Sequence, residues 1–237
     1  MLSGNPVHRD APPVSARRMH RRLEHHDVLL AMGGVATNTP CHRGQEIYSR
    51  EDPAESWYYI VSGLARKCAV RADGRRQIVD FLLPGDFFGF TVWLEHYFTV
   101  EAVVEGTVVS RYPRRRVEII ADDDPRVGRV IREAAFEAVS RSQARMLILG
   151  RMTAPQKVGS FLVEMAERSS ERSSDDGVPG VVLPMSRYDI ADYLAMSVET
   201  VSRTLTILRG LGAIALADRH RVRIVDHKAL VAIGGNW

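Results

Sequence analysis

Cysteine is scarce in this chain of 237 residues, which contains only Cys41 and Cys68. Two cysteines so far apart exclude a disulfide framework and a zinc cluster built from closely paired cysteines. No run of about 18 apolar residues is present, so no membrane-spanning segment is expected. The first residues carry arginine and histidine but no apolar central stretch, and we therefore expect no secretory signal. Together these absences predict a cytoplasmic protein.

Charge of one sign is not in large excess either. The chain has 32 Lys and Arg against 29 Asp and Glu, a net charge of +3, which permits a polyanionic partner without requiring one. The length and a hydrophobic content of 45% favour two domains. A cupin-like metal enzyme would need His and Glu at short spacing on strands, but half of the eight histidines precede residue 27.

The composition and hydrophobic pattern of the sequence divide the chain into four parts. Residues 1–27 mix Pro, Arg and His without hydrophobic periodicity and predict an N-terminal arm, either a solvated tail or a basic arm that touches nucleic acid. Residues 28–117 contain short apolar runs broken by glycines, and Asp73-Gly74 between two such runs predicts a hairpin. We expect this part to be an antiparallel β domain, a jelly roll or a barrel.

Residues 118–150 form the third part, in which the pattern becomes helical. Apolar residues at helical spacing predict a helix from Asp124-Pro125 to about Gly150. The stripe is narrow and rich in alanine, which suits a partner helix and predicts a dimer contact. Packing against the chain's own β domain is an equally good interpretation. The stripe consists of Val127, Val130, Ile131, Ala134 and Ala138.

Residues 151–237 form the fourth part. Thr153-Ala-Pro-Gln156 predicts the start of a helix. A polar loop from Ser169 to Gly180 follows this helix. Ser186 then caps a short helix, and Ser197 caps a second one after a three-residue turn. Two short capped helices so joined predict a helix-turn-helix. The apolar runs at 213–216 and 222–225 predict a hairpin wing.

The second helix of this pair has the pattern of a recognition helix. If Val201, Leu205 and Leu208 point inward, the helical repeat places Glu199, Ser202 and Arg203 on another face near the N-terminus. The Arg203 fork fits guanine, Glu199 can accept from cytosine, and the two can pair four residues apart. We predict phosphate contacts from short or basic side chains around the two helices and the wing. These are Ser186, Arg187, Ser197, Thr200, Thr204, Arg219 and His220.

Three strings carry a resemblance to a known family. MSRYDIADYLAMSVETVSRTLTILRGLGAI resembles the DNA-binding signature of the Crp–Fnr regulators, and YYIVSGLARKCAV with DGRRQIVDFLLPGDFFG resembles their β-roll. The resemblance covers about Val28 to Asp226 and is strongest to the FixK-type regulators of rhizobia, which govern oxygen-limited and nitrogen-fixation genes. It implies an α+β homodimer that binds double-stranded DNA and RNA polymerase and has no enzymatic activity.

The resemblance also implies a DNA site. Val198-Glu199-Thr200-x-Ser202-Arg203 is similar to the Fnr and FixK form rather than to the form of the cyclic-AMP receptor. This likeness implies a palindromic site of the TTG-N8-CAA type, with Val198 among the base-contacting residues. It places Arg203 on the guanine, Glu199 on the opposite strand and Ser202 near a thymine.

The sequence departs from the family where cofactors bind. Phe88-Gly89 is followed by Phe90 rather than an acid, and no Arg-Ser pair follows in the stretch to Phe98, so we expect no cyclic nucleotide. Two cysteines cannot supply the four ligands of an iron–sulfur cluster. We therefore predict no cofactor. A haem- or ligand-dependent regulator using His42, His96 or Cys41 is the alternative, and Cys41 beside His42 and Arg43 is a possible redox-sensitive thiol.

Overall fold

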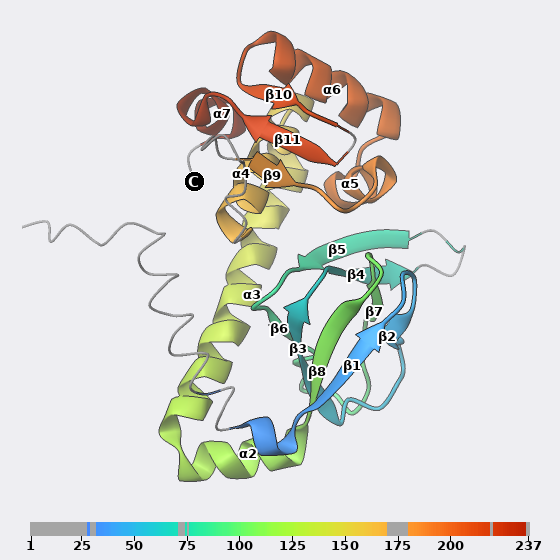
Figure 1. Cartoon of the computed structure of the whole chain (residues 1–237), viewed down its shortest axis with the longest axis vertical. Coiled ribbons are helices and arrows are strands. Elements are labelled where there is room, and N and C mark those ends of the chain that lie inside the picture. The colour runs from blue at the N-terminus through green and yellow to red at the C-terminus, as the bar shows by residue number, and fades with distance from the viewer. Residues whose placement is uncertain are drawn as a thin grey trace, which may run out of the picture.

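The computed structural model describes residues 28, 32–70, 74, 76–169, 180–218 and 220–235. The arm predicted for residues 1–27 lies outside this part of the chain. Figure 1 shows a β domain beside one end of a long helix, and a second, mixed domain at the other end of that helix.

The β domain consists of two four-stranded antiparallel sheets, with the strand orders β1-β8-β3-β6 and β2-β7-β4-β5. It is an open two-sheet roll, so the jelly roll rather than the barrel is confirmed. Strands β4 and β5 pair antiparallel from Ala65 opposite Leu82 to Val70 opposite Arg76, as the predicted hairpin requires, while Asp73 of its turn lies outside the described residues. The short 3-10 helix η1 (Gly33–Val35) precedes the first strand. The strands are β1 (Thr37–Cys41), β2 (Glu46–Tyr48), β3 (Ser56–Ser62), β4 (Ala65–Val70), β5 (Arg76–Leu82), β6 (Phe87–Phe88), β7 (Thr99–Ala102) and β8 (Thr107–Pro113).

Aromatic rings fill the interior of this roll. The ring of Tyr48 stacks on that of His96, with 3.7 Å between their centroids, and lies 5.2 Å from the ring of Tyr58. Phe88 stacks on Tyr58 at 5.3 Å. Gly89 has φ +87°, and a Cβ there would lie 2.8 Å from Cδ2 of Tyr58, so a side chain cannot be added without moving the ring. The centre of the roll is therefore occupied by the chain itself.

Two helices, not one, occupy the region predicted as a single helical part at 118–150. Helix α2 (Arg114–Asp123) ends at Asp124, which caps α3 (Pro125–Arg151) by accepting the N–H of Arg126 at 3.0 Å. The start predicted at Asp124-Pro125 is thus confirmed, but α2 was not expected. Its apolar residues are too few to give a clear period, and only Val117 is buried.

The predicted dimer stripe of α3 faces the chain's own β domain. Val127, Val130 and Ala134 are buried in a cluster that includes Phe87 and Tyr112 of the roll. Ile131 packs at the edge of that cluster, and Ala138 is half-buried. The prediction of a dimer contact was therefore wrong for Val127, Val130 and Ala134, which make the alternative contact with the chain's own β domain. Helical spacing identifies an apolar face, but not the surface that covers it.

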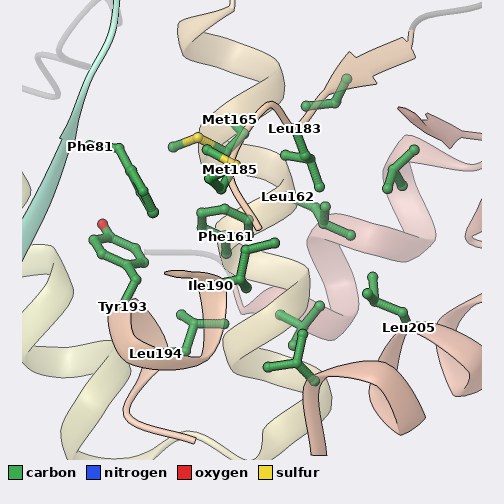
Figure 2. Packing of buried hydrophobic residues seen from close by; sticks show 14 of the residues in the cluster. Phe81, Phe161, Leu162, Met165, Leu183, Met185, Ile190, Tyr193, Leu194 and Leu205 are labelled. Atoms are coloured by element: carbon green, nitrogen blue, oxygen red, sulfur yellow. The ribbon is translucent and has the colours of Figure 1, made fainter. Parts of the chain in front are cut away.

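The second domain is built on helix α4 (Ala154–Arg168) and has one continuous core. Its remaining elements are β9 (Gly180–Val182), α5 (Arg187–Leu194), α6 (Val198–Gly210), β10 (Ile214–Leu216), β11 (Arg221–Ile224) and α7 (His227–Gly234). Figure 2 shows Phe161, Leu162 and Met165 of α4 among the side chains of this core. Phe81 of the roll belongs to the same cluster and lies 5.1 Å from the ring of Tyr193. The two domains therefore share apolar packing.

Candidate DNA interface

Helices α5 and α6 form the predicted helix-turn-helix, within the boundaries read from the sequence. The Ser186 hydroxyl accepts the N–H of Asp189 at 3.1 Å, and the Asp189 carboxylate accepts the N–H of Ser186 at 3.0 Å. This capping box starts α5. Ala195 ends it with φ +50°, and the Ser197 hydroxyl starts α6 by accepting the N–H of Thr200 at 3.2 Å.

The two faces of α6 differ in the way that the helical repeat predicts. Val201, Leu205 and Leu208 are buried against the domain core. Glu199, Ser202 and Arg203 are exposed on the first two turns, and Thr206 continues the same face. An exposed polar face at the N-terminal end of the second helix is the part of a helix-turn-helix that enters the major groove.

The contact between Glu199 and Arg203 differs from the side-chain ion pair that we expected. The Arg203 Nε donates to the backbone carbonyl of Glu199 at 3.4 Å. The Glu199 carboxylate instead accepts from its own N–H and from the Ser197 hydroxyl, and these bonds lower its pKa. Glu199 is therefore ionised at neutral pH and can only accept hydrogen bonds. Arg203 is exposed, so its guanidinium is accessible to an acceptor outside its own helix.

Thr204 does not belong to the interface. Its side chain is only 2% exposed, so the predicted phosphate contact was wrong. The sequence contains the reason, because Thr204 lies three residues after Val201 and four before Leu208 and so shares their buried face. Ser197 is exposed beside α6, with its hydroxyl 3.0 Å from that of Thr200, while Ser186 and Thr200 are half-buried. Arg219 lies outside the described residues.

The wing is the predicted hairpin with a third strand added. Ile214 of β10 pairs with Ile224 of β11, and β9, which the sequence did not predict, pairs with the other edge of β11. At the wing tip, the His220 Nδ1 lies 3.1 Å from the Leu183 carbonyl oxygen, which ties the tip to the end of β9. The His220 residue itself is exposed.

The first turn of α5 contains Arg187, for which a phosphate contact was predicted, and an exposed aromatic residue, Tyr188, which the sequence analysis did not consider. Arg187 is half-buried, and burial lowers its pKa. Its Nη1 is buried and has no hydrogen-bond partner among the described residues. The ring of Tyr188 is 71% exposed. Placing Ile190, Ala191 and Leu194 on the buried face would have put Tyr188 on the outside.

The residues considered for haem or redox chemistry are not arranged for either. His96 stacks on Tyr48, and burial lowers its pKa, while the exposed His42 bonds to Glu105 at 2.6 Å. Cys41 is buried, and burial raises the pKa of its thiol. The prediction of a reactive Cys41 is therefore not supported. Within the described ranges, no group of three or more His, Cys, Asp or Glu side chains is placed to hold a metal ion. No helix in those ranges is long and apolar enough to cross a membrane.

The fold and the exposed face of α6 define a winged helix-turn-helix DNA-binding protein with a β-roll. Models of two families match the chain, the Crp-like helix-turn-helix domain at residues 156–233 and the cyclic nucleotide-binding domain at residues 39–124. The nitrogen fixation regulation protein FixK of Azorhizobium caulinodans is 43% identical over 203 residues, which are 86% of this chain and 80% of the relative. FixK of Rhizobium meliloti is 37% identical over 83% of this chain and 85% of the relative.

A solved structure agrees with these relatives. The structure of FixK2 from Bradyrhizobium japonicum is 34% identical, with a TM-score of 0.78, and the match covers 86% of this chain and 99% of that one. The chain therefore belongs to the FixK-type branch of the Crp–Fnr transcription regulators.

Proposed function

We propose that the protein is a homodimeric transcription activator that recognises a palindromic TTG-N8-CAA-type site through α6. The observation that carries this proposal is the exposed face of Glu199, Ser202 and Arg203 on a capped recognition helix. Arg203 can bond O6 and N7 of guanine, and the ionised Glu199 can accept from an exocyclic amine on the other strand. Ser202 and the half-buried Val198 would contact neighbouring bases, with Val198 offering methyl groups to thymine.

Phosphate contacts would fix the register of α6 in the groove. Ser197 and Thr200 at the start of α6, Ser186 and Arg187 at the start of α5, and His220 with Arg219 on the wing are the candidates. The buried Nη1 of Arg187 has no hydrogen-bond partner among the described residues, and this supports the assignment. If the side chain turned outward on DNA, a phosphate oxygen would supply the missing acceptor.

The dimer that a palindrome requires would form through the outer face of α3. Phe136, Val139 and Met146 are 68%, 52% and 65% exposed, although all three are apolar. With the exposed Gln143 they repeat at steps of three, four and three residues, which is the spacing of a coiled-coil seam. This face replaces the buried stripe that the sequence suggested.

Two features of the β-roll support the proposal that the protein binds no cyclic nucleotide. The rings of Tyr48, Tyr58 and Phe88 occupy its centre. Phe90, where an acid would be needed for a ribose hydroxyl, packs edge-on against Trp57 at 5.5 Å. We therefore propose that the protein binds DNA without a nucleotide and that its amount in the cytoplasm controls its output.

The target genes are proposed from the names of the relatives. The contact with RNA polymerase is proposed from one exposed apolar surface. Three relatives are named nitrogen fixation regulation proteins, so we propose control of genes for nitrogen fixation or for life at low oxygen. A loop of the roll exposes four large apolar side chains, and we propose it as the surface for RNA polymerase. These side chains are Val92, Trp93, Leu94 and Tyr97.

The test is DNA binding by the purified protein, without added ligand, to TTG-N8-CAA duplex and to unrelated duplex. Arg203→Ala should weaken binding to the specific duplex by about 1–3 kcal/mol and relax the choice of base at the guanine. Arg209→Ala is the matched control, because it removes an exposed arginine from the far end of the same helix. Equal loss on both duplexes with Arg203→Ala would overturn the assignment.

A further inference from the structure

A cluster of charged side chains joins the β-roll to the first helix of the helix-turn-helix. Arg66 of β4 and Arg76 of β5 both donate to Oδ1 of Asp189 on α5, at 2.5 and 3.1 Å. Arg76 also bonds Asp192 of α5 at 3.1 Å, and Glu101 of β7 accepts from Arg66 at 2.7 Å. Burial disfavours the charged form of Arg66, but its bond to Glu101 and the charge of Asp189 outweigh burial and raise its pKa.

Asp189 connects this cluster directly to the start of α5. Its Oδ2 completes the capping box with Ser186, while its Oδ1 holds the two arginines of the roll. The Asp189 side chain is only 5% exposed. One buried carboxylate therefore starts the helix-turn-helix and ties it to two strands of the other domain.

The C-terminal end of α5 is also held against β5. Arg145 of α3 donates to the carbonyl of Val79 in β5 at 2.6 Å and to the carbonyl of Tyr193 in α5 at 2.8 Å. Its guanidinium lies 4.4 Å from the centre of the Tyr193 ring. Gln77 of β5 adds a bond to the carbonyl of Asp192. Figure 1 shows α5 next to β5, and these contacts hold it there at both ends.

Desolvation offsets much of the attraction within a buried ion pair, so we expect the bonds of Asp189 to contribute mainly a defined geometry. The geometry that they define here is that of α5 on the roll. Only Ala195, Met196 and Ser197 separate α5 from α6, and α6 packs on α5. The direction of α6 relative to α3 therefore depends on where α5 is held.

We propose that Arg66 and Arg76 are positioning residues for DNA binding, which fix α6 on the roll through Asp189 and so determine the half-site spacing that the dimer accepts. This inference rests on the proposed dimeric reader of palindromic DNA. In such a dimer the two recognition helices must lie one helical turn of DNA apart, about 34–36 Å. The bonds of Arg66 and Arg76 to Asp189 form a bridge between the roll and α5, and this bridge sets the separation. The interior of the roll is occupied by the rings of Tyr48, Tyr58 and Phe88.

The experiment measures binding of the full-length protein to TTG and CAA half-sites separated by 6, 7, 8, 9 and 10 base pairs. In the Arg66→Gln/Arg76→Gln variant, the preference for one spacing should fall by roughly tenfold or more. The preference for guanine over other bases within a half-site should stay as in the wild type, since Arg203 is untouched. Arg66→Lys/Arg76→Lys, which keeps both charges, should restore part of the spacing preference.

The matched control is Arg43→Gln/Arg50→Gln, which removes the same charge from exposed positions of the roll whose bonds go to Glu105, Thr99 and Glu51. It should weaken all duplexes alike through the lost charge and leave the spacing preference intact. A folded bridge variant with wild-type spacing preference, or one that merely weakens every duplex equally, overturns the inference. If the double variant does not fold, Arg76→Gln alone removes the more exposed of the two arginines and one of the two bonds to Asp189, and an unchanged spacing preference there overturns the inference too.

Failure of the proposed function has a different signature. A wild-type protein that binds every spacing, and unrelated DNA, with the same affinity contradicts the palindromic reader itself. A wild type that selects one spacing, together with a bridge variant that selects the same spacing, contradicts only the role of Arg66 and Arg76.

Discussion

The interior of the β-roll is apolar, whereas the contact surface between the two domains, here called the joint, contains many ion pairs. The interior is a cluster of rings and aliphatic side chains around Tyr48, Tyr58 and Phe88. The joint combines the apolar contact of Phe81 with arginines and carboxylates from β4, β5, α3, α4 and α5. Apolar and aromatic side chains occupy the interior of the roll, whereas ion pairs are concentrated where the domains meet.

The largest effect should follow from breaking the joint at Arg168. This side chain is 6% exposed, donates to Asp86 at 2.7 Å and to the Phe81 carbonyl at 2.6 Å, and pairs with Glu164. Arg168→Leu leaves Asp80 and Asp86 with Arg141 as their remaining arginine and takes the donor from the Phe81 carbonyl, so it should lower the free energy of unfolding by about 3–5 kcal/mol. Urea unfolding at neutral pH measures this loss.

Arg50→Gln is the control for this prediction, because Arg50 and Glu51 form a pair that is largely exposed. It should change the free energy of unfolding by less than about 1 kcal/mol. Similar losses in the two variants would contradict the contrast between a buried joint and an ordinary surface.

A smaller effect is expected when one methyl group is removed from the roll interior. Ile60 is fully buried there, so Ile60→Val should lower the free energy of unfolding by about 0.5–1.5 kcal/mol. The spacing preference on DNA should not change, since the Ile60 side chain packs in the roll interior and only its backbone N–H reaches the joint, at the Asp86 carbonyl oxygen. Altered spacing preference in this variant would show that the interior, and not only the joint, positions α6.

The joint should also be sensitive to acid. Burial alone would raise the pKa of Asp80, but Arg141, Arg168 and Lys67 outweigh it, and the pKa lies below its ordinary value of 3.8. The ion pairs of Asp80 are therefore fully stabilising above that pH and are lost as the pH falls below it. The deficit in unfolding free energy of Asp80→Asn against the wild type should shrink between neutral pH and about pH 3. A deficit that is constant over this range contradicts the ionised pair.

The smallest effect concerns one thiol in each region. Cys41 lies in the roll interior and Cys68 in the cluster shared by the domains, and burial raises the pKa of Cys68 to about 12. Neither thiol should react with a thiol-specific disulfide reagent at pH 8 in the folded protein, and both should react in urea. Rapid labelling of Cys41 in the native state would restore the idea of a redox-sensitive site.

Local signals predicted the parts of the fold that local physics determines. Ser186 and Ser197 cap the two helices of the helix-turn-helix in the structure as expected, because a cap needs only residues within one turn. The Asp73-Gly74 turn predicted the β4–β5 hairpin for the same reason. Short or weakly patterned elements were missed, namely α2, β9 and the C-terminal helix α7, since few of their residues carry a periodic signal.

The amino-acid sequence by itself thus determined the class of DNA-binding element, the exposed face of α6 and the lack of a nucleotide-binding acid and arginine. Only the tertiary structure decided which face of α3 is covered, and that Asp189 joins two domains. Arg66 and Asp189 are 123 residues apart in the chain, and no helical or strand period relates them. Their contact follows from the docking of one folded domain on another, which local patterns cannot encode.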